Sequence, residues 1–236
     1  NELEPALKHF TVAVQQRYIL HARAAVDAVA GLALTQQLLR QHDAASASQA
    51  MLEAFTLELG DPQYVGVAYA CRARIALLRG DLTGALAWAL TFHEETTPAA
   101  LFMWLEVPAI TQARVLIACD EAESIEKAID LLGDVQRHSE HCRFVNQIIE
   151  CTLLQSLAHD RMGRGDEALA ALNKVVALSE TRGWLRPFVE AGPPVTDLLN
   201  RLQGQVVAVA FVQRLMAACK NDPSAVGGQR SAPPMG

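Results

Sequence analysis

RGDLTGALAWA (residues 79–89) and GRGDEALAALN (residues 163–173) share a glycine, then an acidic residue, then an Ala-Leu pair. In both stretches the first glycine lies five residues before the alanine of that pair. Two more alanines are interpreted as equivalent, which gives the series Ala47, Ala85, Ala128 and Ala168. The intervals are 38, 43 and 40 residues. A repeat of this length is typical of stacked helical hairpins.

Each unit is predicted to contain a helix, a tight turn with Gly or Asp, and a second helix whose small residue allows a close crossing. Small residues in the first helices match this scheme, because Ala73 and Ser156 lie 12 residues before their partners. Ala113 lies 15 residues before its partner, which predicts about three extra residues in the turn 120–124. The expected fold class is all-α: a right-handed superhelical solenoid of tetratricopeptide-like hairpins with a C-terminal helical cap.

Turn residues divide the chain into the expected elements. A lone second helix is expected over residues 3–16. The hairpins are expected at 22–59, 62–97, 99–138 and 140–182, followed by a cap at 183–219 with short helices near 195–202 and 205–219. Residues 1–220 thus form one repeat domain, and 221–236, rich in Gly, Pro and Ser, a flexible linker or tail.

Composition narrows the function classes. Hydrophobic residues make up 51% of the chain but aromatic residues only 6%, which favours helices over a β-sandwich or barrel. The net charge of −6 and the presence of only four lysines argue against direct binding to nucleic acid. No apolar run is long enough to span a membrane. Five cysteines scattered through apolar sequence indicate reduced thiols and a cytoplasmic location.

Longer stretches resemble the helical-repeat region of large ATP-binding LuxR-family transcriptional regulators, the MalT-like activators. The similarity runs in the family's order over nearly the whole chain, and GWLRPFVEAGPP (residues 183–194) is its most specific piece. The stretches are 21–43, 106–118, 182–202 and 211–222. The resemblance implies a region that senses an inducer or a regulatory protein, with self-association possible.

In that family an ATPase precedes the repeats and a DNA-binding helix-turn-helix follows them. No lysine follows a glycine in this chain, so a Gly-x4-Gly-Lys phosphate loop is absent. The start at Asn1, in the middle of the helical pattern, suggests a fragment of a longer protein. ATP hydrolysis and DNA binding are therefore not expected of this segment, and the alternative is a free-standing tetratricopeptide adaptor that binds a partner's peptide.

Candidate binding residues are expected on the concave side, which the first helices of successive hairpins line. Arg74 and Arg114 each follow the small residue of a first helix, and Gln36 is taken as the equivalent in the preceding unit. Two neighbouring guanidinium groups suit a carboxylate, a phosphate or an acidic peptide. The alternative is that each arginine pairs with an acid such as Glu106 or Glu150 and only solvates the surface.

Further groove residues are predicted nearby. Trp104 lies at the expected start of a first helix, where an aromatic ring either stacks on an inducer such as a sugar or packs in the core. Arg143, Asn146 and Glu150 follow at helical spacing on the next first helix and extend a possible polar wall.

Catalytic and metal chemistry find little support in the sequence. RHSEHC (residues 137–142) holds two histidines and a cysteine, but no second cluster completes a zinc site. No Gly-x-Ser-x-Gly elbow is present. We expect no enzyme activity, no metal and no cofactor, and a binding function instead.

Overall fold

The computed structural model describes residues 2–93, 105–202 and 208–221, and all regular secondary structure in these ranges is helical. The predicted all-α class is confirmed for this part of the chain. Its helices are α1 (Leu3–Gln15), α2 (Ala22–Leu38), α3 (His42–Leu59), α4 (Pro62–Leu78), α5 (Leu82–Thr91), α6 (Pro108–Cys119), α7 (Ala122–Cys142), α8 (Val145–Arg161), α9 (Gly165–Glu180), α10 (Arg186–Ala191), α11 (Pro193–Leu202) and α12 (Val209–Asn221).

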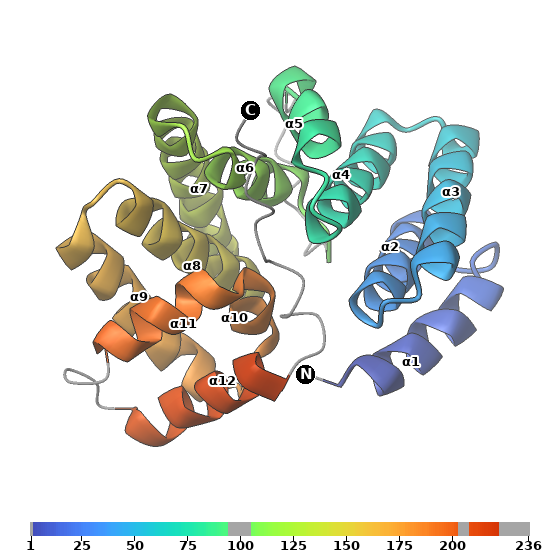
Figure 1. Cartoon of the computed structure of the whole chain (residues 1–236). Helices are drawn as coiled ribbons and strands as arrows, with labels where there is room; N and C mark the ends of the chain where they lie inside the picture. The colour runs from blue at the N-terminus through green and yellow to red at the C-terminus, as the bar shows by residue number, and fades with distance from the viewer. Residues whose placement is uncertain (1, 94–104, 203–207, 222–236) are drawn as a thin grey trace, which may run out of the picture.

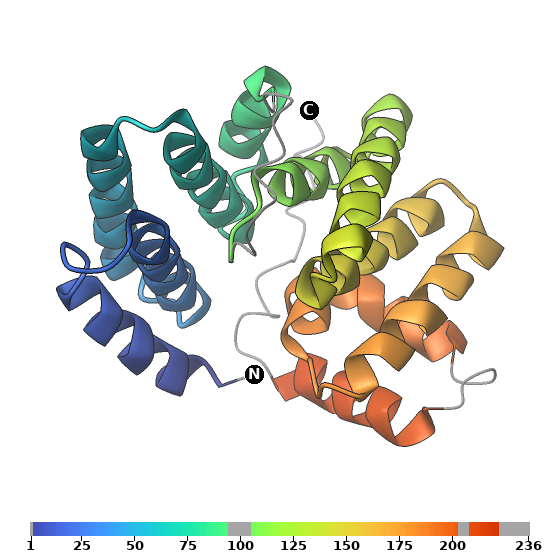
Figure 2. The ribbon, with the colours of Figure 1, turned by 180° about the vertical axis from the view of Figure 1, so that it is seen from behind.

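The helices pack as antiparallel neighbours along a curved path (Figure 1). The pairs α2–α3, α4–α5, α6–α7 and α8–α9 are hairpins, and α2, α4, α6 and α8 also contact one another in succession. Figure 2 shows the same path from behind, with α1 and α12 on the same side of the molecule. The chain therefore curves so that α1 and residues 183–190 line the same cavity.

Three apolar clusters follow one another along this path. The first spans α1–α4, and the third, which is the largest, spans α6–α12. Between them lies a small middle cluster whose fully buried members are Ala85, Ala89 and Val115. Each hairpin thus buries its apolar side on its neighbours rather than in one central core.

Turn chemistry explains where the hairpins reverse. Gly80 and Gly163 end first helices with φ of 81° and 72°, a left-handed conformation that a side chain disfavours. The Asp81 carboxylate accepts a hydrogen bond from the Gly84 N–H at 2.9 Å and so caps α5. Pro62 occupies the first turn of α4, where its missing N–H costs no helical hydrogen bond. The preceding Asp61 caps this helix, because its carboxylate accepts a hydrogen bond from the Gln63 N–H.

Small residues lie where the helices of a hairpin cross. Ala85, Ala128 and Ala168 are all fully buried. The Ser156 hydroxyl, fully buried on α8, donates a hydrogen bond to the Ala168 carbonyl oxygen at 2.9 Å. The side chains at these crossings are thus small enough for one helix to hydrogen-bond the backbone of the other.

The predicted equivalence of Ala47 is wrong. Ala47 is exposed, whereas Ala45 is fully buried and lies three residues into its helix, as Ala85 and Ala168 do in theirs. Both alanines belong to the same polar-and-alanine stretch, so sequence alone did not separate them. The interval from Ala45 to Ala85 is then 40 residues.

The third hairpin also differs from the prediction. Its first helix begins at Pro108 instead of residue 99, and 94–104 lie outside the described residues. The turn before α7 is only Asp120 and Glu121, so the expected longer turn at 120–124 is wrong. The three extra residues lie inside α7, which begins six residues before Ala128.

After α9, residues 186–191 form a short helix that the sequence reading missed. The proline in this stretch argued against a helix, although a proline at the start of a helix costs no hydrogen bond. Phe188 on α10 is fully buried in the third apolar cluster. The helices expected near 195–202 and 205–219 correspond to α11 and α12, and 203–207 and most of the predicted tail lie outside the described residues.

Among the described helices, none has both the length and the apolar character that crossing a bilayer requires.

A bulky residue at a crossing tests this packing. We expect Ala168→Leu to lower the free energy of unfolding by about 1–3 kcal/mol, because the added atoms force α8 and α9 apart. Ala170→Leu, on the exposed side of the same helix, is the control and should change it by less than about 0.5 kcal/mol. Urea unfolding followed by circular dichroism measures both. Equal effects of the two substitutions would contradict the assigned crossing.

Candidate functional site

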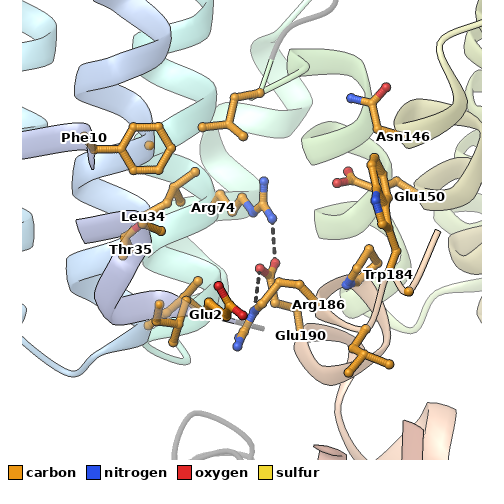
Figure 3. Close-up of a pocket in the computed structure, with 18 residues that line it drawn as sticks. Glu2, Phe10, Leu34, Thr35, Arg74, Asn146, Glu150, Trp184, Arg186 and Glu190 are labelled. Carbon is orange, nitrogen blue, oxygen red and sulfur yellow. Dashed lines mark hydrogen bonds and ion pairs between the residues drawn. The ribbon is translucent and has the colours of Figure 1, made fainter. Parts of the chain in front are cut away.

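The candidate site is a cavity of about 400 Å³ on the inner side of the curve. We call it the central cavity. Its lining comes from α1, α2, α4, α8 and the segment 183–190, with Glu2 and Leu105 beside them. Residues close to the start of the chain therefore face residues nearly two hundred positions later (Figure 3).

Arg74 lines the central cavity and carries a positive charge. It follows the buried Ala73 on α4, and its side chain is only 11% exposed. Its Nη1 donates to Glu106 Oε2 at 2.7 Å, and its Nη2 donates to Glu190 Oε2 at 2.5 Å. Glu106 precedes α6 and Glu190 lies on α10, so one guanidinium holds two distant segments together.

Both carboxylates have further partners. The Thr111 hydroxyl donates to Glu106 Oε1, and Arg186 Nε donates to Glu190 Oε1 at 3.1 Å. We call Arg74, Glu106, Glu190 and Arg186 the buried ion-pair network. It contains two positive and two negative groups, so formal charge balances within it.

Arg74 and Glu190 are held in their ionised forms. Burial raises the pKa of Glu190, but the positive charges of Arg74, Arg186 and Arg114 outweigh burial and lower this pKa to about 2. Burial alone would lower the pKa of Arg74, yet Glu190 and Glu106 raise it well above its ordinary value. Proton transfer near neutral pH is therefore not a property of these groups.

A second ion pair lies beside the first. Arg114 Nη2 on α6 donates to Glu150 Oε2 on α8 at 3.0 Å, and Glu150 lines the central cavity. Asn146 lies one helical turn before Glu150 and also lines the cavity. Two buried atoms here have no hydrogen-bond partner among the described residues: Arg114 Nε and Asn146 Oδ1.

Aromatic rings lie on opposite walls. The Phe10 ring packs against α2 at Gly31, where a Cβ atom would come within 2.5 Å of the ring. Figure 3 shows Phe10 with Leu34 and Thr35 on one wall and Trp184 with Asn146 and Glu150 on the other. Trp184 is partly buried against the third apolar cluster. Because Gly31 has no side chain, the first wall can be aromatic.

The predicted arginines face acids, as the alternative interpretation had it. Arg74 pairs with Glu106 and Glu190, and Arg114 pairs with Glu150. Arg74 lines the central cavity, whereas Arg114 does not.

Gln36 does not line the cavity. It accepts a hydrogen bond from the Ser48 hydroxyl at 2.7 Å within its own hairpin. The misplaced Ala47 explains the error: counting 12 residues back from Ala45 gives Ala33, and the next residue, Leu34, does line the cavity.

The predicted polar wall on α8 is partly wrong. Asn146 and Glu150 line the cavity, but Arg143 precedes the helix. It ends α7 in a left-handed conformation with φ of 59° and is exposed. Trp104 lies outside the described residues.

Several cavity residues escaped the sequence reading as binding candidates: Glu2, Phe10, Arg186 and Glu190. Trp184, which lies in the stretch 183–194, was likewise not predicted to bind a ligand. All five lie on or next to α1 or α10, outside the four hairpins, and no repeat equivalent pointed to them. Only the Trp-Leu-Arg-Pro-Phe-Val-Glu stretch stood out from the pattern.

Metal ligands do not gather in the described part of the chain, where no three His, Cys, Asp or Glu side chains are placed to share an ion. The pair His138 and Cys142 lies with Nε2 and Sγ 3.3 Å apart at the end of α7.

Removing one charge from the network should be costly. We expect Glu190→Gln to lower the free energy of unfolding by about 3–5 kcal/mol, because Arg74 then keeps a buried charge without its full complement. Glu123→Gln is the matched control, because its ion pair with Lys127 is exposed to solvent and its loss should change the stability little. Urea unfolding at pH 7 measures both, and similar losses would contradict the role of the network.

The same variant predicts a pH dependence. The pKa of Glu190 is lowered from 4.5 to about 2 in the folded protein, so the unfolded chain takes up the proton first as the pH falls. Stability from this carboxylate is therefore complete above about pH 5 and is lost as the pH falls toward about 2. Unfolding free energies of wild type and Glu190→Gln should converge over this range. A constant difference would contradict the assignment.

Comparison with known proteins gives one family. The family described as "MalT-like TPR region" matches residues 1–205. No curated protein matches the chain. The match covers α1–α11 and therefore every element that lines the central cavity. The chain belongs to the MalT-like TPR region family.

Proposed function

We propose that this chain is the sensor and protein-interaction region of a MalT-like, LuxR-family transcriptional regulator. It binds a small inducer or a regulatory protein on its concave side, in the central cavity. The hairpins form a right-handed superhelix, and α10–α12 cap its end. Binding is relayed to ATPase and DNA-binding domains elsewhere in the regulator, which acts in the cytoplasm and self-associates when active.

One observation carries this proposal: the Arg74–Glu190 ion pair joins α4 to α10 beside the cavity, across 116 residues of chain. A ligand in the cavity touches α1 and α2 on one side and α8 and α10 on the other. Such a ligand contacts both halves of the array at once. Its binding energy therefore depends on how the two halves are arranged.

That dependence is what a relay requires. A ligand shifts a conformational equilibrium only by its difference in affinity for the two states. A ligand that bridges both walls binds the closed arrangement better than one in which α10 has moved away from α4. Inducer binding would then favour one arrangement of the array and so bias the domains attached to it.

The chemistry of the cavity supports binding rather than catalysis. The carboxylates of Glu106 and Glu190 are paired with arginines, and the lowered pKa of Glu190 keeps that group from exchanging protons near neutral pH. The thiols of Cys71 and Cys151 are buried, and burial raises both pKa values, so neither is a reactive thiolate.

A thermal-shift screen with sugars, amino-acid derivatives, amines and nucleotides tests the proposal. A compound at 100 times its Kd adds about 2.7 kcal/mol to stability. That should raise the Tm by about 5–10 °C for a chain of this size.

A filled cavity provides the control. Ala6 on α1 lines the cavity, so Ala6→Trp should abolish the shift. Ala170→Trp places the same ring on the exposed side of α9 and should keep it. A shift that persists in Ala6→Trp, or a screen in which no compound shifts the Tm, would overturn the proposal.

A further inference from the structure

We propose that the ligand of the central cavity is a small organic cation: an ammonium or amidinium group attached to an aromatic or aliphatic body. This inference rests on the proposed function and names the ligand class of the same site. It differs from the expectation that the arginines would hold a carboxylate or a phosphate.

The arginines of the cavity are already engaged by acids. Arg74 gives Nη1 to Glu106 and Nη2 to Glu190. Arg186 gives Nε to the other oxygen of Glu190 and has further interactions. An incoming anion would have to displace Glu190, a carboxylate that is 93% buried and held by two guanidinium groups. The network therefore disfavours anionic ligands.

Glu150, in contrast, favours a positively charged ligand. Arg114 binds its Oε2 from outside the cavity, and no described residue donates a hydrogen bond to its Oε1. Its side chain is 24% exposed, and in Figure 3 the carboxylate points toward the space between the two walls. A protonated amine placed there would gain a charge-assisted hydrogen bond.

The formal charge of the cavity lining also favours a positively charged ligand. Three acidic residues line the cavity against two basic ones, which gives a formal sum of −1. The acids are Glu2, Glu150 and Glu190, and the bases are Arg74 and Arg186. Just outside the lining, Glu106 and Arg114 carry opposite charges and cancel. A ligand with one positive charge therefore neutralises the site.

The walls define the rest of the ligand. Phe10 and Trp184 present aromatic rings on opposite sides, and Leu34, Leu38 and Leu105 complete an apolar lining. Aromatic faces attract cations as well as apolar bodies. A cavity of about 400 Å³ accommodates a ligand of roughly ten to twenty non-hydrogen atoms. Size, apolarity and charge thus point to one class of compound.

Three probes of nearly equal shape separate the alternatives: 2-phenylethylamine, 2-phenylethanol and phenylacetate. They carry a positive charge, no charge and a negative charge at neutral pH. Isothermal titration calorimetry at low salt should show that the amine binds at least tenfold more tightly than the alcohol. Phenylacetate should bind more weakly than either, and salt should reduce the preference for the amine.

Substitutions test which side chains of the cavity bind the amine. Glu150→Gln keeps an oxygen for Arg114 but removes the negative charge, so it should weaken amine binding about tenfold and leave alcohol binding nearly unchanged. Glu180→Gln, an exposed acid on α9, is the control and should change neither. Trp184→Leu should weaken both probes. Circular dichroism checks that each variant folds.

The outcomes separate this inference from the proposed function. If the alcohol or phenylacetate binds best, and Ala6→Trp abolishes that binding, the cavity is a sensor site but the cation class is wrong. If the amine binds but Glu150→Gln has no effect on it, the assignment to Glu150 is wrong and the inference is overturned. If none of the three probes binds, the inference also fails, while the screen described above still decides the proposed function.

Discussion

Arg74 is the charge on which the arrangement of the two ends depends. Its guanidinium binds Glu106, which precedes α6, and Glu190 on α10, and all three side chains are buried. A buried charge that loses its partner costs several kcal/mol, so these segments cannot separate without a large penalty. The network therefore fixes α10 against the first helices of the hairpins, and the central cavity exists because these segments are held in place.

The repeat pattern predicted the helical class and most of the hairpins because it reports local rules. Gly80 adopts a left-handed conformation in a turn, and Ala168 is buried where two helices cross. The residue types that favour both features can be recognised within a dozen residues of sequence. The pattern failed where several residues satisfy the same rule. Ala45 and Ala47 are both small and lie in the same helix, and only their burial in the folded chain distinguishes them. That error of two residues displaced the expected site from Leu34 to Gln36.

The candidate site was less predictable because it depends on contacts between distant segments. The sequence pointed to Arg74 and to the possibility of an acid opposite it, but the partner Glu190 lies 116 residues away and outside the repeats. No spacing rule connects such a pair. Arg143 shows the reverse case: it fits the helical spacing of α8, yet it ends the preceding helix. Periodicity describes faces of helices and says nothing of where a chain reverses.

The apolar packing varies along the array, because the middle cluster is much smaller than the clusters on either side. Hydrophobic stabilisation scales with the apolar area buried, and Ala85, Ala89 and Val115 bury little compared with the clusters on either side. The apolar packing is therefore weakest in the middle of the array, where the Arg74–Glu190 ion pair connects α4 to α10 on the inner side. A movement that opens the curve by carrying α10 away from α4 has to break this ion pair and leave two buried charges without a partner.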